Sequence, residues 1–209
     1  LSLPEATATA VAHELLRSRI QCQSIDGLPF TIARAVTAME TSTETRAALD
    51  WGASTATFVL IRDGRPVFTR QFPQCGFSQI TEGIQQRLDL PFAECHRLVQ
   101  AIGMFPEDVC SMSSVSRLVS KAVEGTIRGL SDEIRCTLRF LKSQSEICPQ
   151  KLTLLGGGAS IRQTCERLSE LTGLSVSPWT FPKPMNFELP EQGMASFANA
   201  YAATIGAVS

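Results

Sequence analysis

Asp50 stands in a short run, 49–55, whose residue types suit the metal and phosphates of a nucleotide. Apolar residues surround the carboxylate, so we expect a strand to deliver it to a strand end. Gly52 leaves room for close approach of a ligand, and Ser54 and Thr55 offer hydroxyl donors. A carboxylate beside such a turn suits Mg²⁺, which takes a few protein oxygens together with water and phosphate. The same residues also fit an ordinary hairpin, in which aspartate and glycine serve only the turn geometry.

A second small-residue turn consists of three glycines at 156–158, followed by Ala159. The run 151–155 before it is apolar and predicts a buried strand, and apolar residues repeat at helical spacing over 159–172. A strand, a glycine turn and a helix place backbone N–H groups where they can bind an anion. The run is neither a P-loop nor a G-x-G-x-x-G fingerprint, and it is equally typical of a tight connection between a strand and a helix.

The residues between the two motifs predict the scaffold that positions them. Two strand candidates, 55–61 and 65–72, are joined by Asp63 and Gly64, a pair that favours a hairpin turn with positive φ. With the strand that ends at Asp50, they predict a three-stranded meander. Helical periodicity then dominates 77–143.

This order of elements resembles the second half of the actin-like ATPase fold, an α/β fold of the ribonuclease H-like kind. In that family an Asp-x-Gly-x-x-Thr hairpin grips phosphate and a Gly-Gly turn holds adenosine. The sequence is most similar to the family's pilus-assembly branch, the PilM-like proteins of the FtsA/PilM superfamily. Further segments carry this resemblance: Phe-x-Arg at 68–70, Ala-Glu-x-x-Arg at 93–97, a helix pattern at 133–138 and a closing run at 198–208.

The resemblance implies a nucleotide site that binds ATP with Mg²⁺. In relatives the Ala-Glu-x-x-Lys helix contacts the ribose and the purine, which assigns these roles to Glu94 and Arg97, with arginine in place of lysine. Asp50 is expected to hold Mg²⁺ through water. The expected nucleotide-binding residues are Asp50, Gly52, Ser54, Thr55, Glu94, Arg97, Gly156, Gly157, Gly158 and Ala159. No catalytic residue is assigned.

The resemblance also divides the chain into two parts. Residues 1–43 are expected to be a remnant of the first half's inserted subdomain and the crossover, with a helix at 5–18 and a strand at 20–25. Residues 44–209 are expected to form the second half. Its sheet subdomain is expected to comprise 44–76 and 151–209, with a closing helix at 194–207, and its helical subdomain 77–150.

The family's fold has two halves, and each contributes one phosphate hairpin. No Asp-x-Gly hairpin precedes Asp50 in this sequence. The chain is therefore expected to be a fragment that lacks the N-terminal part and binds ATP and Mg²⁺ weakly or not at all.

The composition argues against several other classes of protein. The chain has 209 residues, a net charge of −1 and 19% charged residues, so it carries no electrostatic signature of nucleic-acid binding. No apolar run reaches the length of a membrane span. The seven cysteines include no C-x-x-C, which favours reduced thiols that fill the core. The proline-rich stretch 178–184 predicts an irregular, packed connector.

Three functions follow from these resemblances. The first is a cytoplasmic nucleotide-binding scaffold, held at the inner membrane by the N-terminal cytoplasmic peptide of a PilN-like protein, with slow or no hydrolysis and possible self-association. The second is a sugar kinase of the same superfamily, which needs an aspartate as general base, although none of Asp26, Asp63 and Asp89 lies in a motif for that role. The third is the cytoplasmic actin-like domain of a type II secretion protein, which usually lacks a working nucleotide site, whereas both motifs are intact here.

Overall fold

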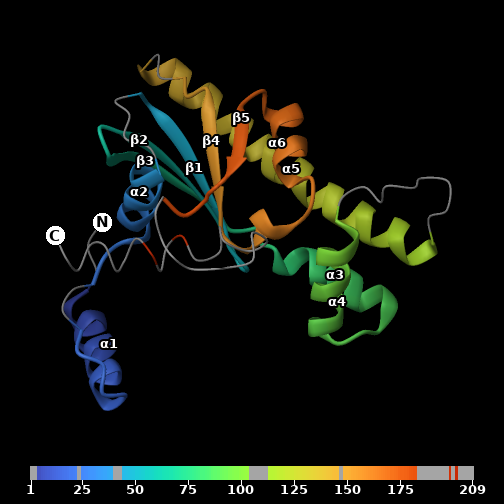
Figure 1. Ribbon diagram of the computed structural model, residues 1–209, viewed down its shortest axis with the longest axis horizontal. Helices are drawn as coiled ribbons and strands as arrows, with labels where there is room; N and C mark the ends of the chain where they lie inside the picture. Colours follow the sequence, from blue (N-terminus) through green and yellow to red (C-terminus); the bar gives the residue numbers. More distant parts are fainter. Residues whose placement is uncertain are drawn as a thin grey trace.

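The computed structural model describes residues 4–22, 25–39, 44–103, 113–145 and 148–182, together with Ala198 and Tyr201. Helices and strands alternate in a mixed α/β arrangement (Figure 1). The described elements are α1 (Glu5–Arg17), α2 (Leu28–Met39), β1 (Arg46–Trp51), β2 (Ala56–Arg62), β3 (Arg65–Phe72), α3 (Ser78–Leu88), α4 (Phe92–Ile102), α5 (Ser114–Ser145), β4 (Lys151–Leu155), the 3₁₀ helix η2 (Gly157–Ser160), α6 (Thr164–Thr172) and β5 (Ser175–Pro178).

Within the described residues, one sheet holds five strands in the order β3-β2-β1-β4-β5. Strands β1, β2 and β3 form the predicted antiparallel meander, and β4 and β5 run parallel to β1. Asp63 (φ 50°) and Gly64 (φ 70°) make the expected tight turn between β2 and β3. Because β1 and β4 are parallel neighbours, their carboxyl ends meet at one edge of the sheet. The predicted fold class is therefore confirmed.

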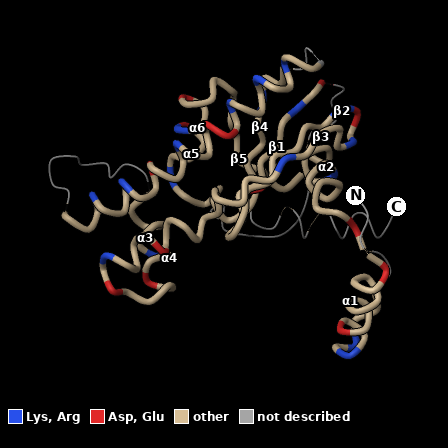
Figure 2. The backbone as a smooth tube through the Cα atoms, turned by 180° about the vertical axis from the view of Figure 1, so that it is seen from behind, with Lys and Arg blue, Asp and Glu red and all other residues tan. Residues whose placement is uncertain are grey.

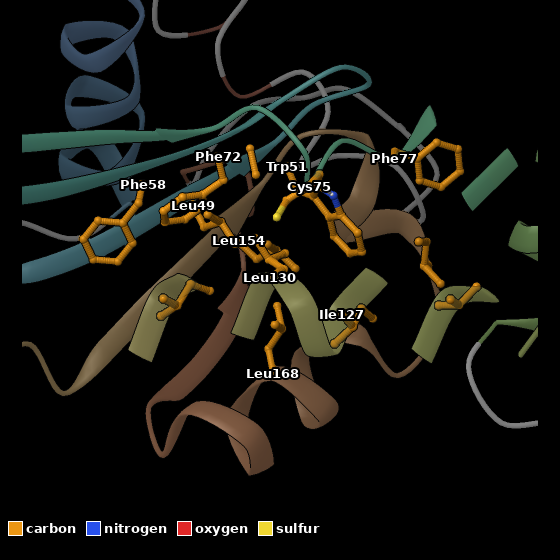
Figure 3. Close-up of a cluster of buried hydrophobic side chains, with 14 of the residues drawn as sticks. Leu49, Trp51, Phe58, Phe72, Cys75, Phe77, Ile127, Leu130, Leu154 and Leu168 are labelled. Carbon is orange, nitrogen blue, oxygen red and sulfur yellow. Dashed lines mark hydrogen bonds between the residues drawn. The ribbon is translucent and has the colours of Figure 1, made fainter. Parts of the chain in front are cut away.

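The sheet separates two apolar cores, because successive side chains of a strand point to opposite faces. Leu49 and Trp51 of β1 pack with α3, α4, α5 and α6 in the larger cluster (Figure 3). Ala48 packs on the other face, against α2. Trp179 closes this second core, and its Nε1 donates a hydrogen bond to the backbone oxygen of Ala35 at 2.8 Å.

Ion pairs join α5 to α6, two helices that cover the same face of the sheet. Glu124 of α5 accepts hydrogen bonds from Arg167 of α6, one of them from Nε at 3.1 Å, and also from Arg128 Nε at 2.6 Å. Glu170 accepts a further bond from Arg167 at 2.7 Å. Acidic and basic segments lie side by side where these helices meet (Figure 2). Glu124 and Arg167 therefore tie α5 to α6.

Several predicted elements differ from the structure. The strand predicted at 20–25 is wrong for its described residues, because 20–22 and 25 have no strand structure. The helix predicted at 159–172 begins only at Thr164, because η2 and Gln163, which has φ 65°, precede it. The predicted closing helix at 194–207 lies outside the described residues, apart from Ala198 and Tyr201.

The predicted helix near the N-terminus is confirmed as α1, and none of its residues is buried. It projects away from the sheet (Figure 1). Helix α2 and strand β5 were not predicted. Pro178 ends β5 at the edge of the sheet, and Trp179 is 1% exposed, so the start of the proline-rich stretch is packed as expected. Among the described residues, no helix combines the length and apolar character that a bilayer span needs.

Candidate functional site

The aspartate motif and the glycine turn meet where β1 and β4 end. Asp50 lies opposite Leu155 in the parallel pairing, one residue before the turn. A Cβ added to Gly156 would stand 2.5 Å from Oδ1 of Asp50 and 2.6 Å from the backbone oxygen of Trp51. Gly156 also has φ 83°, which favours glycine. The structure thus brings the two predicted motifs into direct contact, with Asp50 only 9% exposed.

Trp51 forms the surface on which the glycine turn rests, and sequence reasoning missed this role. A Cβ on Gly158 would overlap atoms Cδ2 and Cε3 of the indole and would stand 2.6 Å from Cγ. The indole is fully buried, and its Nε1 donates to the backbone oxygen of Cys75 at 2.7 Å (Figure 3). Position 158 is therefore glycine because Trp51 occupies the space of a side chain.

Gly157 is the open member of the turn. It is exposed, has no positive φ, and a Cβ there would meet nothing within 4 Å. Ser160 closes the turn by donating from Oγ to the backbone oxygen of Gly157 at 2.6 Å. The expectation that a full helix begins directly after the turn is wrong, because the short η2 takes that place and α6 begins later. On this side of the site, a ligand can therefore approach the backbone at Gly157, and it does not meet the N-terminus of a long helix.

The aspartate hairpin is held by the start of α3. Gly52 donates from its N–H to the backbone oxygen of Thr55 at 3.0 Å, which closes the loop. The N–H groups of Phe77 and Ser78 donate to the backbone oxygens of Gly52 and Ala53 at 3.0 and 2.8 Å. The loop carbonyls thereby satisfy N–H groups at the start of α3 that have no partner within the helix.

The predicted hydroxyl donors of this hairpin are accessible to different degrees. Ser54 is exposed and Thr55 is half-buried. A Cβ on Gly76 would overlap the backbone of Ser54, so the loop and the start of α3 approach as closely as glycine allows. The fold fixes this hairpin firmly while leaving its tip in contact with solvent.

Glu94 and Arg97 lie on the outer side of α4. Their side chains, 50% and 75% exposed, form an ion pair with each other at 2.9 Å. Among the described residues, no hydrogen bond or ion pair joins the side chain of Glu94 or Arg97 to Asp50 or to the glycine turn. Helix α4 itself packs on the start of α3, because the ring of His96 lies against that of Phe77, the residue before α3, with centroids 5.1 Å apart.

The three aspartates considered as a kinase base have structural roles instead. Asp26 accepts hydrogen bonds from the N–H of Gly27 at 2.8 Å and from the Arg34 guanidinium. Asp63 adopts the positive φ of the β2–β3 turn, and Asp89, with φ 51°, ends α3. The carboxylate of Asp26 is thus engaged within the protein, which argues against its use as a general base.

Burial disfavours the thiolate form of two cysteines in the larger apolar cluster. Burial raises the pKa of the Cys75 thiol above its ordinary value, and it raises the pKa of Cys165 to about 11. Within the described residues, no three His, Cys, Asp or Glu side chains gather as a metal-binding group. A metal held by Asp50 would complete its coordination with phosphate and water, as Mg²⁺ commonly does.

The strand order and the meeting of the two motifs define the class of protein: the chain has the actin-like ATPase fold. A chain of the PilM–PilN type IV pilus biogenesis complex is similar, with TM-score 0.77 and 22% identity over 98% of this chain and 59% of that one. The expected resemblance to the pilus-assembly branch agrees with this similarity.

Two other solved structures share the fold. MreB5 of Spiroplasma citri, bound to ADP, has TM-score 0.71 and 13% identity over 98% of this chain and 65% of its own. The ethanolamine utilization protein EutJ from Carboxydothermus hydrogenoformans has TM-score 0.67 and 16% identity over 96% and 61%. The chain thus spans less than two thirds of each of these proteins. No protein-family model and no curated protein matches the sequence.

Proposed function

We propose that this chain belongs to a cytoplasmic, nucleotide-binding scaffold for type IV pilus assembly. The observation that carries the proposal is the contact between Asp50 and the glycine turn at Gly156, at one edge of an actin-like sheet. The similarity to a chain of the PilM–PilN complex supports the assignment to pilus assembly.

The proposed ligand is ATP with Mg²⁺. Asp50 holds the metal through water, which suits a carboxylate that is mostly covered by the turn and leaves most of the coordination to phosphate and solvent. The exposed tip at Ser54 and Thr55 meets the phosphates. Gly157, the open position of the turn, lets the backbone approach the adenosine. A nucleotide in the actin-like fold of MreB5 supports this choice of ligand.

Glu94 and Arg97 complete the site on the α4 side. Both side chains are exposed and bound to each other, so either can turn to a ribose hydroxyl or a purine at the cost of a surface ion pair. Such pairs contribute about 0–1 kcal/mol. Hydrolysis is proposed to be slow or absent, as the resemblance to the pilus-assembly branch implies.

The proposed partner is the N-terminal cytoplasmic peptide of a PilN-like inner-membrane protein, which keeps the scaffold at the membrane surface. Nucleotide is proposed to strengthen capture of this peptide. If ATP raises the affinity for the peptide by some factor, the peptide must raise the affinity for ATP by the same factor.

The test is a titration of the full-length gene product with the PilN-like peptide of the same organism, with and without Mg-ATP. We expect tighter binding with Mg-ATP. A Gly157→Val variant should bind the peptide with one affinity in both conditions, because its branched side chain blocks the turn. Equal affinities for the wild type in the two conditions would refute the nucleotide-switched scaffold, and no binding in either would refute the proposed partner.

A further inference from the structure

The segment after the glycine turn holds the end of α4. Arg162, two residues beyond η2, donates from Nη2 to the backbone oxygens of Ala101 and Ile102, the latter at 3.4 Å. These carbonyls belong to the last turn of α4, where they have no partner within the helix. A guanidinium at this position also offsets the negative end of the helix dipole.

A close backbone contact reinforces these hydrogen bonds. Gly103, directly after α4, is buried and has φ 66°. A Cβ added there would lie 3.0 Å from the Cβ of Arg162 and 3.3 Å from its backbone oxygen. The end of α4 and the segment that continues from the glycine turn are therefore packed directly against each other, although about 60 residues separate them in sequence.

The other parts of α4 carry the proposed adenosine contacts. Glu94 and Arg97 lie on the same helix as Ala101 and Ile102. An α-helix rises about 1.5 Å per residue and is stiff over this length, so a contact at its end affects the position of side chains one to two turns away. The Arg162 contact is thus one of the contacts that place these two side chains relative to the glycine turn, together with the packing of Cys95 and Val99 in the core.

We propose that Arg162 is a positioning residue for adenosine. It acts by holding α4 against the segment that follows the glycine turn and not by contacting the nucleotide. The inference rests on the proposed nucleotide site. It predicts that loss of Arg162 affects recognition of the nucleoside more than recognition of the phosphates, because the phosphate-binding hairpin is held by hydrogen bonds from Phe77 and Ser78 and not by Arg162.

The experiment is calorimetric titration of the full-length gene product with Mg-ATP and, separately, with Mg-tripolyphosphate. Arg162→Ala should lower the affinity for ATP about tenfold or more, because a lost charge-assisted hydrogen bond corresponds to at least that factor, and should leave tripolyphosphate binding unchanged. Arg162→Lys should restore most of the ATP affinity, because an ammonium can donate to the same carbonyls. Arg139→Ala is the matched control, since Arg139 also donates to a helix carbonyl, that of Arg135 at 3.4 Å, but on the exposed side of α5.

Three outcomes would overturn the inference. Unchanged ATP affinity in Arg162→Ala would remove the positioning role. Equal losses for ATP and tripolyphosphate, or no rescue by lysine, would show a general structural effect instead. A wild type that binds tripolyphosphate as tightly as ATP would refute any recognition of adenosine but leave the phosphate site standing, whereas a wild type that binds neither ligand would refute the proposed function itself.

Discussion

Alanine at position 158 should destabilise the protein strongly, whereas alanine at position 157 should not. A Cβ on Gly158 would overlap the Trp51 indole, which is fully buried and fixed by its hydrogen bond to Cys75. Overpacking a core costs about 1–3 kcal/mol. Displacing the ring would also break the Nε1 hydrogen bond, which contributes about 1 kcal/mol. We therefore expect Gly158→Ala to lose about 2–4 kcal/mol of unfolding free energy.

Gly157→Ala is the matched control, one residue away in the same turn. Its Cβ would meet no atom within 4 Å, and its φ is not positive, so the change should stay within about 0.5 kcal/mol. The assay is urea unfolding followed by far-ultraviolet circular dichroism, with the near-ultraviolet spectrum reporting on the tryptophans. Equal urea midpoints for Gly158→Ala and the wild type would refute the view that Trp51 supports the turn, and so would equal losses in the two variants.

Three further changes test the packing around the site. Glu124→Gln should cost about 1.5–3 kcal/mol at neutral pH, because it weakens the charge-assisted bonds to Arg167. Hydrogen bonds from Arg167 hold the pKa of Glu124 below its usual value. The stabilisation is therefore present above the unfolded-state pKa of about 4.3 and is lost as the pH falls through the lower folded-state pKa. Urea midpoints of the wild type and the variant that do not converge in acid would contradict this. Gly125→Ala should raise the unfolding free energy by about 0.5–1 kcal/mol, because Gly125 is exposed within helix α5 and a Cβ there meets open space. An unchanged or lower melting temperature would count against this. Trp179→Phe should cost about 1–3 kcal/mol, measured by urea unfolding, because the carbonyl of Ala35 loses its donor, and a midpoint equal to that of the wild type would contradict that.

Local sequence signals predicted the centre of the fold well. The predicted bounds of β3 and β4 match the structure, because alternation, apolar runs and the Asp63-Gly64 turn act over a few residues. The same signals missed β5, whose four residues Ser-Val-Ser-Pro include a single aliphatic side chain. Its strand structure depends on pairing with β4, a contact that no local pattern encodes. The strand predicted at 20–25 is wrong for residues 20–22 and 25, which shows that a local apolar pattern alone is not enough to form a strand.

The candidate site was predictable in its motifs but not in its supports. Asp50 and the glycine turn were expected to belong to one nucleotide site, and the parallel pairing of β1 with β4 brings them together. The three glycines, treated alike in the sequence, differ in the structure, because Gly158 packs on Trp51 and Gly157 faces open space. Arg162 could not be found from spacing, since its partners lie on a different helix far back in the chain. The nucleotide roles of these residues remain predictions.

Calorimetric titration of the full-length gene product with ATP, with and without Mg²⁺, tests the nucleotide site most directly. We predict that Mg²⁺ strengthens ATP binding by the wild type and that Asp50→Ala loses most of this gain, because the carboxylate acts through the metal. Gly157→Val should weaken binding in both conditions, because its side chain blocks the turn. If Asp50→Ala lost the same affinity with and without Mg²⁺, or bound Mg-ATP as tightly as the wild type, the central claim about this site would be contradicted.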